Sequence, residues 1–207
     1  ALKPAFFSKN SSAEWLRKGL IVFQFTISLA LIIGALIIDR QIHFMRYSDM
    51  GFNKDAVIHF EVPYQQPKGK KTVLKNKLEQ IAGIQAISMH ASIPASNNIN
   101  TSIFKYNDGK EDKDYEFHVK VADSAYIHLY DIPLLAGHNI QASDTLREFV
   151  INETAMHLLG FKDPQDAIDK TLINNDQRFS IVGVVKDFHI RSLQQPIYPL
   201  AIVAGDN

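Results

Sequence analysis

The residues of this chain that could bind a metal are its eight histidines. They fall in different expected elements: His43, His59, His90, His118, His128, His138, His157 and His189. The acid–histidine spacing that we weigh is Asp187-x-His189, because residues i and i+2 of an extended strand point to the same side. Two ligands alone do not define a metal site. The pattern therefore favours dispersed polar side chains, and we expect no metal centre.

The sequence gives equally little support for acid–base, nucleophilic or phosphate-binding chemistry. Glu111, Asp112, Asp114 and Glu116 cluster, but interleaved lysines indicate a solvated hairpin tip. The chain has no G-x-S-x-G elbow around a serine and no glycine-rich phosphate loop with its lysine. It also has no cysteine, which excludes disulfides and thiol nucleophiles. We therefore expect no catalytic site and no cofactor, and any ATP would be bound by another chain.

Length and charge narrow the class of protein further. Lysine plus arginine and aspartate plus glutamate number 22 each, so no net field attracts nucleic acid, and we expect no nucleic-acid partner. The chain has 207 residues, and after a membrane segment of about twenty residues one soluble domain of ordinary size remains.

That membrane segment is the uncharged run from Gly19 to Ile38. As a helix it would span roughly 30 Å, which is the thickness of the hydrocarbon core of a bilayer. A signal peptide is one alternative, but the apolar residues run directly into Asp39 without a cleavage site of small residues. A buried soluble helix is the other, and the run exceeds its usual length. We therefore expect a transmembrane helix over residues 19–38 in a lipid bilayer.

The flanking charges predict how this helix is oriented. The preceding segment, residues 1–18, is basic: Lys3, Lys9, Arg17 and Lys18, with Glu14 as the acid. Charges after the run balance: Asp39, Arg40, Arg46 and Asp49. Because positive residues are retained in the cytoplasm, residues 1–18 should be a cytoplasmic juxtamembrane segment.

Small residues form a ladder within the expected membrane helix. Thr26, Ala30 and Gly34 recur at intervals of four, a spacing that lets a second helix approach closely. Gln24 is also unfavourable in lipid, which favours packing against other membrane helices. The alternative is that small residues are common in any membrane helix.

The helix should continue beyond the bilayer as a stalk over residues 39–50. Ile38, Ile42 and Met45 keep an i, i+4, i+7 stripe, which indicates that the helix continues. Gly51 is expected to end the helix, because glycine adopts the left-handed conformation at helix ends.

The residues after the stalk are expected to form a mixed α/β domain. With the helix that precedes it, we assign the chain to the α+β fold class. We expect a strand–helix–strand unit at residues 57–62, 70–81 and 84–93, and a hairpin at 99–106 and 115–121. Two further strands are expected at 149–151 and 179–185, and Asn152 should cap a helix between them.

Five segments resemble FtsX-like, MacB-type permease subunits of ABC transporters. The first two are the helix entry at residues 16–28 and the stalk exit at 50–55. The other three match the periplasmic domain of that family and lie at residues 132–139, 150–155 and 181–189. The chain departs from the family turn at residues 163–170, which is therefore expected to be remodelled.

The resemblance implies a permease subunit of the bacterial inner (cytoplasmic) membrane, with residues 51–207 as a MacB-like periplasmic domain. It implies a porter-like part containing the strand–helix–strand unit and an inserted subdomain at about 124–178. Its partners would be a cytoplasmic ABC ATPase subunit, other permease membrane helices or a second permease protomer, and a periplasmic adaptor or substrate. The implied role is non-catalytic, in efflux or envelope maintenance. It would couple ATP hydrolysis by the separate subunit to motion of the periplasmic domain, and Ile38, Ile42 and Met45 would transmit this motion along the stalk. We expect the chain to be a fragment, truncated at its carboxyl end before a second porter segment and a returning membrane helix.

Two other functions stay open from the residues alone. An extracytoplasmic ligand-sensing domain of a membrane receptor would share the helix and the α/β domain, and would continue into a kinase or cyclase module. An enzyme is the remaining class, and it would have to use Asp187 or His189.

Overall fold

The computed structural model describes residues 11–63, 67, 69–96, 100–109, 111–141 and 148–205, and the side chains of 11 and 12 are not described. The chain divides after Ser48 into a helical unit and a compact domain that begins at Asp49. Among the expectations above, those for Lys3, Lys9 and residue 99 lie outside the described residues.

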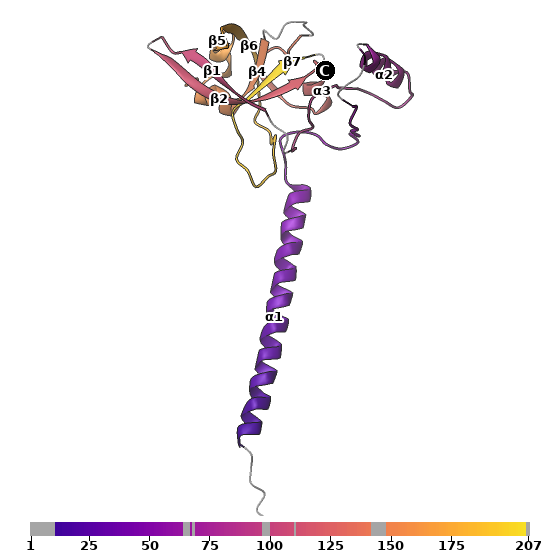
Figure 1. Cartoon of the computed structure of the whole chain (residues 1–207), viewed down its shortest axis with the longest axis vertical. Helices are drawn as coiled ribbons and strands as arrows, with labels where there is room; N and C mark the ends of the chain where they lie inside the picture. The colour runs from indigo at the N-terminus through magenta and orange to yellow at the C-terminus, as the bar shows by residue number, and fades with distance from the viewer. Residues whose placement is uncertain are drawn as a thin grey trace, which may run out of the picture. The chain divides into compact units, whose positions relative to one another are not determined.

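The helical unit is a single α-helix, α1, over Ser11–Tyr47 (Figure 1). It is long and apolar enough to cross a membrane, and none of its described side chains is buried. The predicted continuation beyond residue 38 is confirmed. The predicted stop at Gly51 is wrong by about one turn, because Asp49 accepts a hydrogen bond from the amide of Gly51 and forms a turn that competes with the helix.

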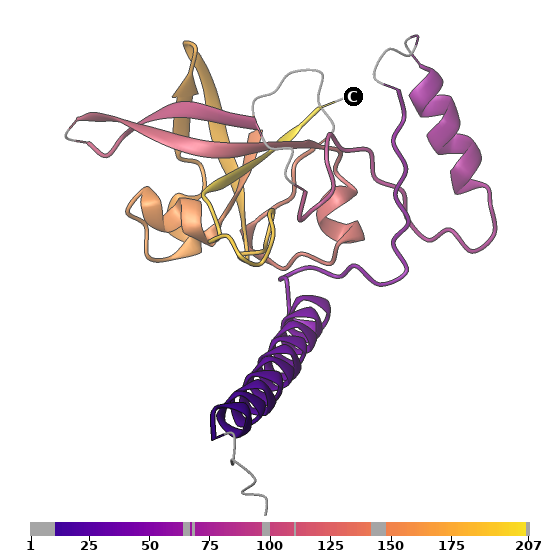
Figure 2. The same ribbon diagram turned by 60° about the horizontal axis from the view of Figure 1, so that its bottom comes forward.

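The domain is built on a seven-stranded sheet in the order β3-β6-β4-β7-β2-β1-β5. The strands are β1 Asn100–Asn107, β2 Asp112–Ala122, β3 Leu134–Gly137, β4 Glu148–Asn152, β5 Thr171–Asn174, β6 Gln177–Val185 and β7 Leu200–Ala204. Because β6 also pairs with β5, the strands from β6 through β4, β7, β2 and β1 to β5 close into a ring. The contact between β1 and β5 is narrow, with one register pair at Lys105 and Ile173. The long β1–β2 hairpin projects beyond the other strands (Figure 2).

The helices of the domain are short. They are α2 Lys70–Glu79, α3 Tyr126–Leu129, α4 Glu153–Leu158 and the 3-10 helix η1 Pro164–Ala167. Asn152 accepts a hydrogen bond from the amide of Ala155 at 3.0 Å, so the predicted cap of α4 is confirmed. Asp163 caps η1 in the same way through the amide of Gln165.

Two buried clusters lie on opposite faces of the sheet. Alternate residues of β7 show the division, since Ala201 and Val203 belong to one cluster and Leu200, Ile202 and Ala204 to the other. The first cluster is rich in phenylalanine and is completed by α4 and η1. The second is completed by α3 and by residues 188–190. Burial on both faces explains why β6 and β7 are nearly continuous apolar runs rather than alternating ones.

The expected strand–helix–strand unit is only partly present. Its helix is α2, but residues 57–62 carry no strand and residues 84–93 contribute one isolated bridge, between His90 and Ala122. The side chain of Ile58 is 90% exposed and that of Phe60 is 60% exposed. The apolar pattern alone therefore did not predict a strand correctly here, because a strand also needs a neighbouring strand to pair with.

The other predicted elements are found, with some omissions. The hairpin corresponds to β1 and β2, and the later strands to β4 and β6, so the mixed α/β domain after one N-terminal apolar helix is confirmed. Strands β3, β5 and β7 were missed. Strands between residues 124 and 178 share one sheet with strands outside that range, and the inserted subdomain stays a prediction.

Phe149 tests the phenylalanine-rich cluster. Its ring stacks on Phe179 at 4.6 Å and meets Phe104 edge-on at 5.0 Å, and the residue is 1% exposed. We expect Phe149→Ala to lower the free energy of unfolding of the domain by about 3–5 kcal/mol, because it leaves a cavity. Urea denaturation of residues 49–207 measures this loss.

Ile103→Ala is the control, since Ile103 is 59% exposed on β1. Its loss should stay below about 1 kcal/mol. Equal losses in the two variants would contradict the assignment of Phe149 to the centre of the core.

Candidate functional site

The predicted helix-packing residues lie along α1 without a described partner helix. Thr26 donates its hydroxyl to the carbonyl oxygen of Val22 at 2.9 Å, so this polar group is already satisfied within the helix. Thr26 and Ala30 are exposed, and a Cβ added at Gly34 would meet no atom within 4 Å. The role of these three residues in helix packing stays a prediction.

The predicted transmission residues follow the helix-packing residues along α1, and Ile38 and Ile42 continue their spacing of four. Ile38 is 57% exposed, and Ile42 and Met45 are each 46% exposed. A step of four residues advances by about 40° round a helix, so this stripe faces about 90° away from Thr26, Ala30 and Gly34. The two stripes can therefore serve different neighbours, and the transmission role stays a prediction.

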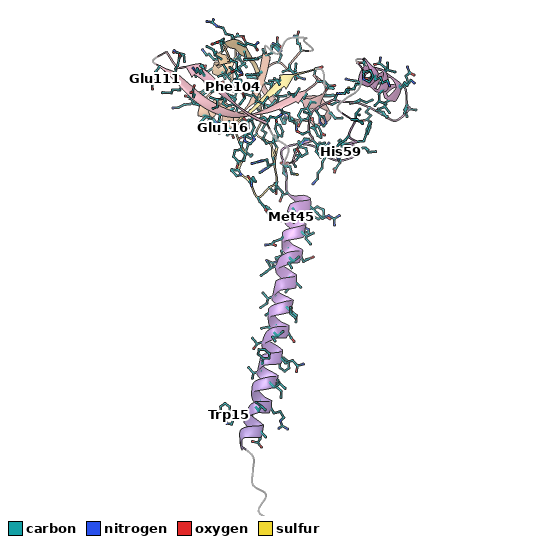
Figure 3. The ribbon with its side chains drawn as sticks, in the orientation of Figure 1. Trp15, Met45, His59, Phe104, Glu111 and Glu116 are labelled. Carbon is teal, nitrogen blue, oxygen red and sulfur yellow. The ribbon has the colours of Figure 1, made fainter. Side chains whose placement is uncertain are left out.

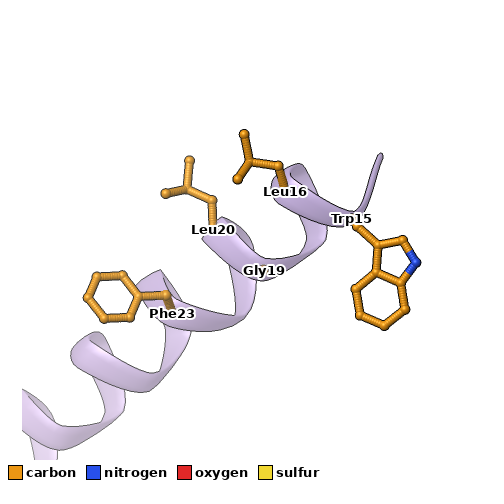
Figure 4. A pocket seen from close by; sticks show the side chains of 5 residues that line it. All are labelled: Trp15, Leu16, Gly19, Leu20 and Phe23. Carbon is orange, nitrogen blue, oxygen red and sulfur yellow. The ribbon is translucent and has the colours of Figure 1, made fainter. Parts of the chain in front are cut away.

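An apolar hollow lies at the start of α1, lined by Trp15, Leu16, Gly19, Leu20 and Phe23. Figure 4 shows these side chains spread along the turns of one helix, with Trp15 turned away from Leu16 and Leu20. It is an exposed helix surface and has no polar groups suited to catalysis.

The most distinctive arrangement in the domain holds the segment that directly follows α1. We call residues 49–55 the anchor segment. The carbonyl oxygen of Met50 accepts a hydrogen bond from the amide of His189 at 2.8 Å. The amide of Asn53 donates to the carbonyl oxygen of Tyr130, also at 2.8 Å. The backbone of the anchor segment is therefore bound at two points, one after β6 and one at the end of α3.

Phe52 supplies the apolar part of this attachment. Its ring meets Tyr130 edge-on with centroids 5.8 Å apart, and Phe188 edge-on at 6.4 Å. Phe188 and Tyr130 belong to the second buried cluster, and Phe52 packs against that cluster. The aromatic contacts and the hydrogen bonds thus hold the segment on the same part of the domain.

Gly51 permits the close approach of the two backbones. Its φ of +78° lies in the left-handed region, and a Cβ would lie 2.6 Å from the carbonyl oxygen of Asp187 and 2.8 Å from the Cα of Phe188. A side chain at this position would therefore push the anchor segment away from the domain.

Asp187 fixes the opposite side of that contact. Its carboxylate accepts hydrogen bonds from the amide of Thr154 at 2.9 Å and from the hydroxyl of Thr154 at 2.7 Å. Its own amide donates to the carboxylate of Glu153 at 2.9 Å. These bonds tie the end of β6 to the start of α4. They also give Asp187 a structural role.

Asn152 links the start of α4 to the buried strands of the domain. It is 1% exposed, and its side-chain oxygen accepts from the amides of Ala155 and Leu200 at 3.0 and 2.9 Å. Its side-chain nitrogen donates to the carbonyl oxygen of Tyr198 at 3.0 Å. One amide group therefore joins β4, α4 and the start of β7.

Four of the five segments that carry the family resemblance meet in this region. Residues 50–55 contact residues 181–189, and the latter bind residues 150–155 through Asp187. Residues 132–139 join them because the amide of Lys186 donates to the carbonyl oxygen of Pro133 at 2.8 Å. Segments far apart in the sequence are thus brought together at the attachment point of the anchor segment.

A second polar cluster was missed by the sequence analysis. Lys120 is 6% exposed, and burial lowers its pKa to about 7. Burial, followed by the charge of Lys120, lowers the pKa of His90 to about 4. The signal was present in β2, where Lys120 is in phase with His118 and Ala122 and therefore faces the second cluster.

The acidic cluster and the histidines show no catalytic arrangement. Glu111, Asp112, Asp114 and Glu116 are exposed on the β1–β2 hairpin, as predicted for a solvated tip (Figure 3). Lys113 pairs there with Asp108 at 3.1 Å. Within the described ranges, no three histidine or acidic side chains are placed to hold a metal ion.

Solved domains of other proteins are similar to part of this chain. One is the periplasmic region of MacB from Actinobacillus actinomycetemcomitans, with 17% identity, a TM-score of 0.46, and coverage of 64% of this chain and 54% of that chain. Another is the extracellular domain of the ABC-type transporter YknZ from Gram-positive bacteria, with 15% identity, a TM-score of 0.43, and coverage of 63% and 59%. This chain thus spans little more than half of either structure. No protein-family model and no curated protein matches the sequence.

Gly51→Ala tests the close approach of the anchor segment. We expect a loss of more than about 2 kcal/mol in the unfolding free energy of residues 49–207. The Cβ combines left-handed strain with a clash against backbone. Chemical denaturation of the domain measures the loss.

Gly109→Ala is the matched control. Its φ is +88°, yet a Cβ there would meet nothing within 4 Å. It should cost only the strain of about 1–2 kcal/mol. If both variants lost the same amount, the contact with Asp187 and Phe188 would not matter.

Proposed function

We propose that the chain is a non-catalytic permease subunit of an ABC-type transporter for efflux or envelope maintenance, and a member of the FtsX-like, MacB-type family. In this role a separate ATPase subunit hydrolyses ATP, and the permease passes the resulting motion from its membrane helix to the outward-facing domain. The observation that carries the proposal is the anchor segment. The residues that resemble the family are those that fasten this segment to the domain.

The order of the chain makes this a short mechanical connection. Only Ser48 and Asp49 separate Tyr47, the last residue of α1, from Met50, the first residue bound to the domain. At about 3.5 Å per residue, so short a link gives the end of the helix little independent travel. A displacement of α1 would therefore be imposed on the anchor segment.

The anchor segment would pass that displacement on as a rigid body. It is held by two backbone hydrogen bonds, by the ring of Phe52, and by a close backbone contact at Gly51. Packed interiors are stiff and transmit strain, whereas a flexible linker would absorb it. This arrangement supports a transmitter of motion better than a chain that only tethers a domain.

The proposal assigns partners to the two stripes of α1. Thr26, Ala30 and Gly34 would pack against other permease helices or a second protomer, and Ile38, Ile42 and Met45 would transmit motion beyond the bilayer. A cytoplasmic ABC ATPase subunit would act from the side of residues 1–18. The domain would lie in the periplasm, outside the inner membrane, and meet an adaptor or a substrate there.

Gly34→Leu and Met45→Asp test the two stripes in the full-length protein in its membrane. We expect Gly34→Leu to reduce several-fold the amounts of the ATPase subunit and of a second permease protomer that co-purify with the variant. Leucine at this position prevents the close approach of another helix to α1. We expect Met45→Asp to leave assembly intact and to lower the ATPase activity of the reconstituted complex several-fold.

Ile32→Phe and His43→Asp are matched controls, because each alters the roughly opposite side of the helix. Both should retain assembly and ATPase activity. Unchanged assembly and activity in Gly34→Leu and Met45→Asp would refute the roles of these stripes.

Labelling of single cysteines tests the orientation, since the chain has no cysteine of its own. Ala13→Cys lies before the apolar run and Ser124→Cys is exposed on the domain. In cells with a permeabilised outer membrane, an impermeant maleimide should label Ser124→Cys at once. It should label Ala13→Cys only after lysis. The reverse pattern would place the domain in the cytoplasm and exclude the proposed function.

A further inference from the structure

We call the ring of strands β6, β4, β7, β2, β1 and β5 the barrel, and the unit formed by α2 and residues 84–92 the α2 layer. The α2 layer is attached to the barrel mainly by polar contacts. No residue of α2 is buried, so the helix is not held by an apolar core. Polar contacts join this layer to the end of β2. Three of them are made to the carboxylate of Asp123, and the amide of Ala91 donates to the carbonyl oxygen of Val121 at 3.0 Å.

Asp123 accepts hydrogen bonds from several parts of this layer. Lys75 of α2 donates at 2.8 Å, the hydroxyl of Ser88 at 2.7 Å and the amide of Met89 at 3.0 Å. The amide of Asp123 in turn donates to the carbonyl oxygen of Met89 at 3.0 Å. Burial alone would raise the pKa of Asp123, but the bonds from Lys75, Met89 and Ser88 lower it below its usual value. The carboxylate therefore stays ionised and bound at neutral pH.

Residues 88–92 run beside the end of β2, where the surroundings of His90 disfavour a positive charge on its ring. His90 forms the isolated bridge to Ala122, and its ring meets Tyr126 edge-on at 5.3 Å. Its Nε2 lies 3.4 Å from the hydroxyl of Tyr130, and its Nδ1 is buried. Because the ring is largely shielded from water, burial disfavours its charged form.

Lys120 contacts the same segment, and its positive charge makes protonation of His90 less favourable. Its Nζ donates to the hydroxyl of Ser92 at 3.1 Å and sits 5.3 Å from the centre of the Tyr126 ring. The charged and titratable groups that face His90 are thus Lys120 and Asp123 at the end of β2, His59 from the preceding segment, and Tyr126 and Tyr130 of the α3 region. Burial, Lys120 and His59 oppose a proton on His90, while Asp123 and a backbone hydrogen bond to Ser92 favour it.

We propose that residues 88–92 form an acid-released latch, which holds the α2 layer on the barrel through Asp123 and opens when His90 takes up a proton. The device belongs to the domain itself and does not depend on the transport role. Opening exposes His90 and Lys120 to water, where both accept protons freely, and it uncovers the end of β2.

The direction of the pH effect follows from linkage. The pKa of His90 is about 4 when the latch is closed and 6.5 when the ring is free in water, so opening takes up a proton between these values. The closed state is therefore favoured above pH 6.5 and loses that advantage as the pH falls towards 4. Lys120, with a closed-state pKa of about 7, acts in the same direction and mainly above pH 7. Acid loosens the latch in both cases.

Hydrogen–deuterium exchange of the full chain in nanodiscs tests the latch. Protection factors are compared at pH 7.5 and pH 5.0, after correction for the intrinsic exchange rate. In the wild type, peptides covering residues 70–92 should lose protection by about thirtyfold at the lower pH, from His90 alone. Peptides from β6 and β7 should change much less.

His90→Phe should abolish most of the pH effect in residues 70–92, because it keeps an aromatic ring beside Tyr126 but cannot take up a proton. His128→Phe is the control, since His128 is exposed on α3, and it should keep the full effect. Asp123→Asn should lower the protection of residues 70–92 already at pH 7.5, whereas Asp114→Asn, at an exposed position of β2, should not.

Three results would overturn the proposal. One is equal protection of residues 70–92 in the wild type at the two pH values. Another is an unchanged pH effect in His90→Phe. The third is a loss of protection in Asp123→Asn that is as large in β6 and β7 as in residues 70–92, because Asp123 would then support the whole fold.

Discussion

The attachment of the chain after α1 depends on one carboxylate, that of Asp187. Both of its oxygens are bound by Thr154 at the start of α4, and its amide is bound by Glu153. This fixes the backbone of residues 187–188 in the place where Gly51 approaches it. A carboxylate beside a helix start is also stabilised by the helix dipole. These bonds help to fix the surface that receives the anchor segment.

The closed sheet gives that surface a stiff base. Residues of β4, β6 and β7 are buried on both faces, and the two clusters fill the inside of the ring and the side that carries Phe52, Tyr130 and Phe188. The anchor segment is therefore attached to the core of the domain and not to a loop. The α2 layer differs, because polar bonds to Asp123 join it to β2 and none of the residues of α2 is buried. We expect the domain to respond to motion of the helix as one body, while the α2 layer retains freedom of its own.

The sequence was informative where a local rule decides the structure. The uncharged run gave α1, Asn152 gave the start of α4, and the continuous apolar run of residues 179–185 gave β6. It misled at residues 57–62, where alternation of apolar residues is present but the described chain offers no strand to pair with. It also left the meaning of Asp187 open, because its partner Thr154 is 33 residues away in sequence. The alternation in β2 placed Lys120 on the same face as Ala122, but its contacts with Ser92 and Tyr126 are made only in the fold.

In the proposed function, the anchor segment and the barrel move as one rigid body when α1 is displaced. Spin labels at Asp55→Cys and Ser124→Cys, both exposed in the wild type, report on this directly in the cysteine-free chain. Their distance distribution is measured by double electron–electron resonance in the reconstituted complex, without nucleotide and with ATP trapped. The account predicts one narrow distribution that is the same in both states. A shift or a second population on ATP binding would show that the anchor segment slides on the domain and would contradict the account.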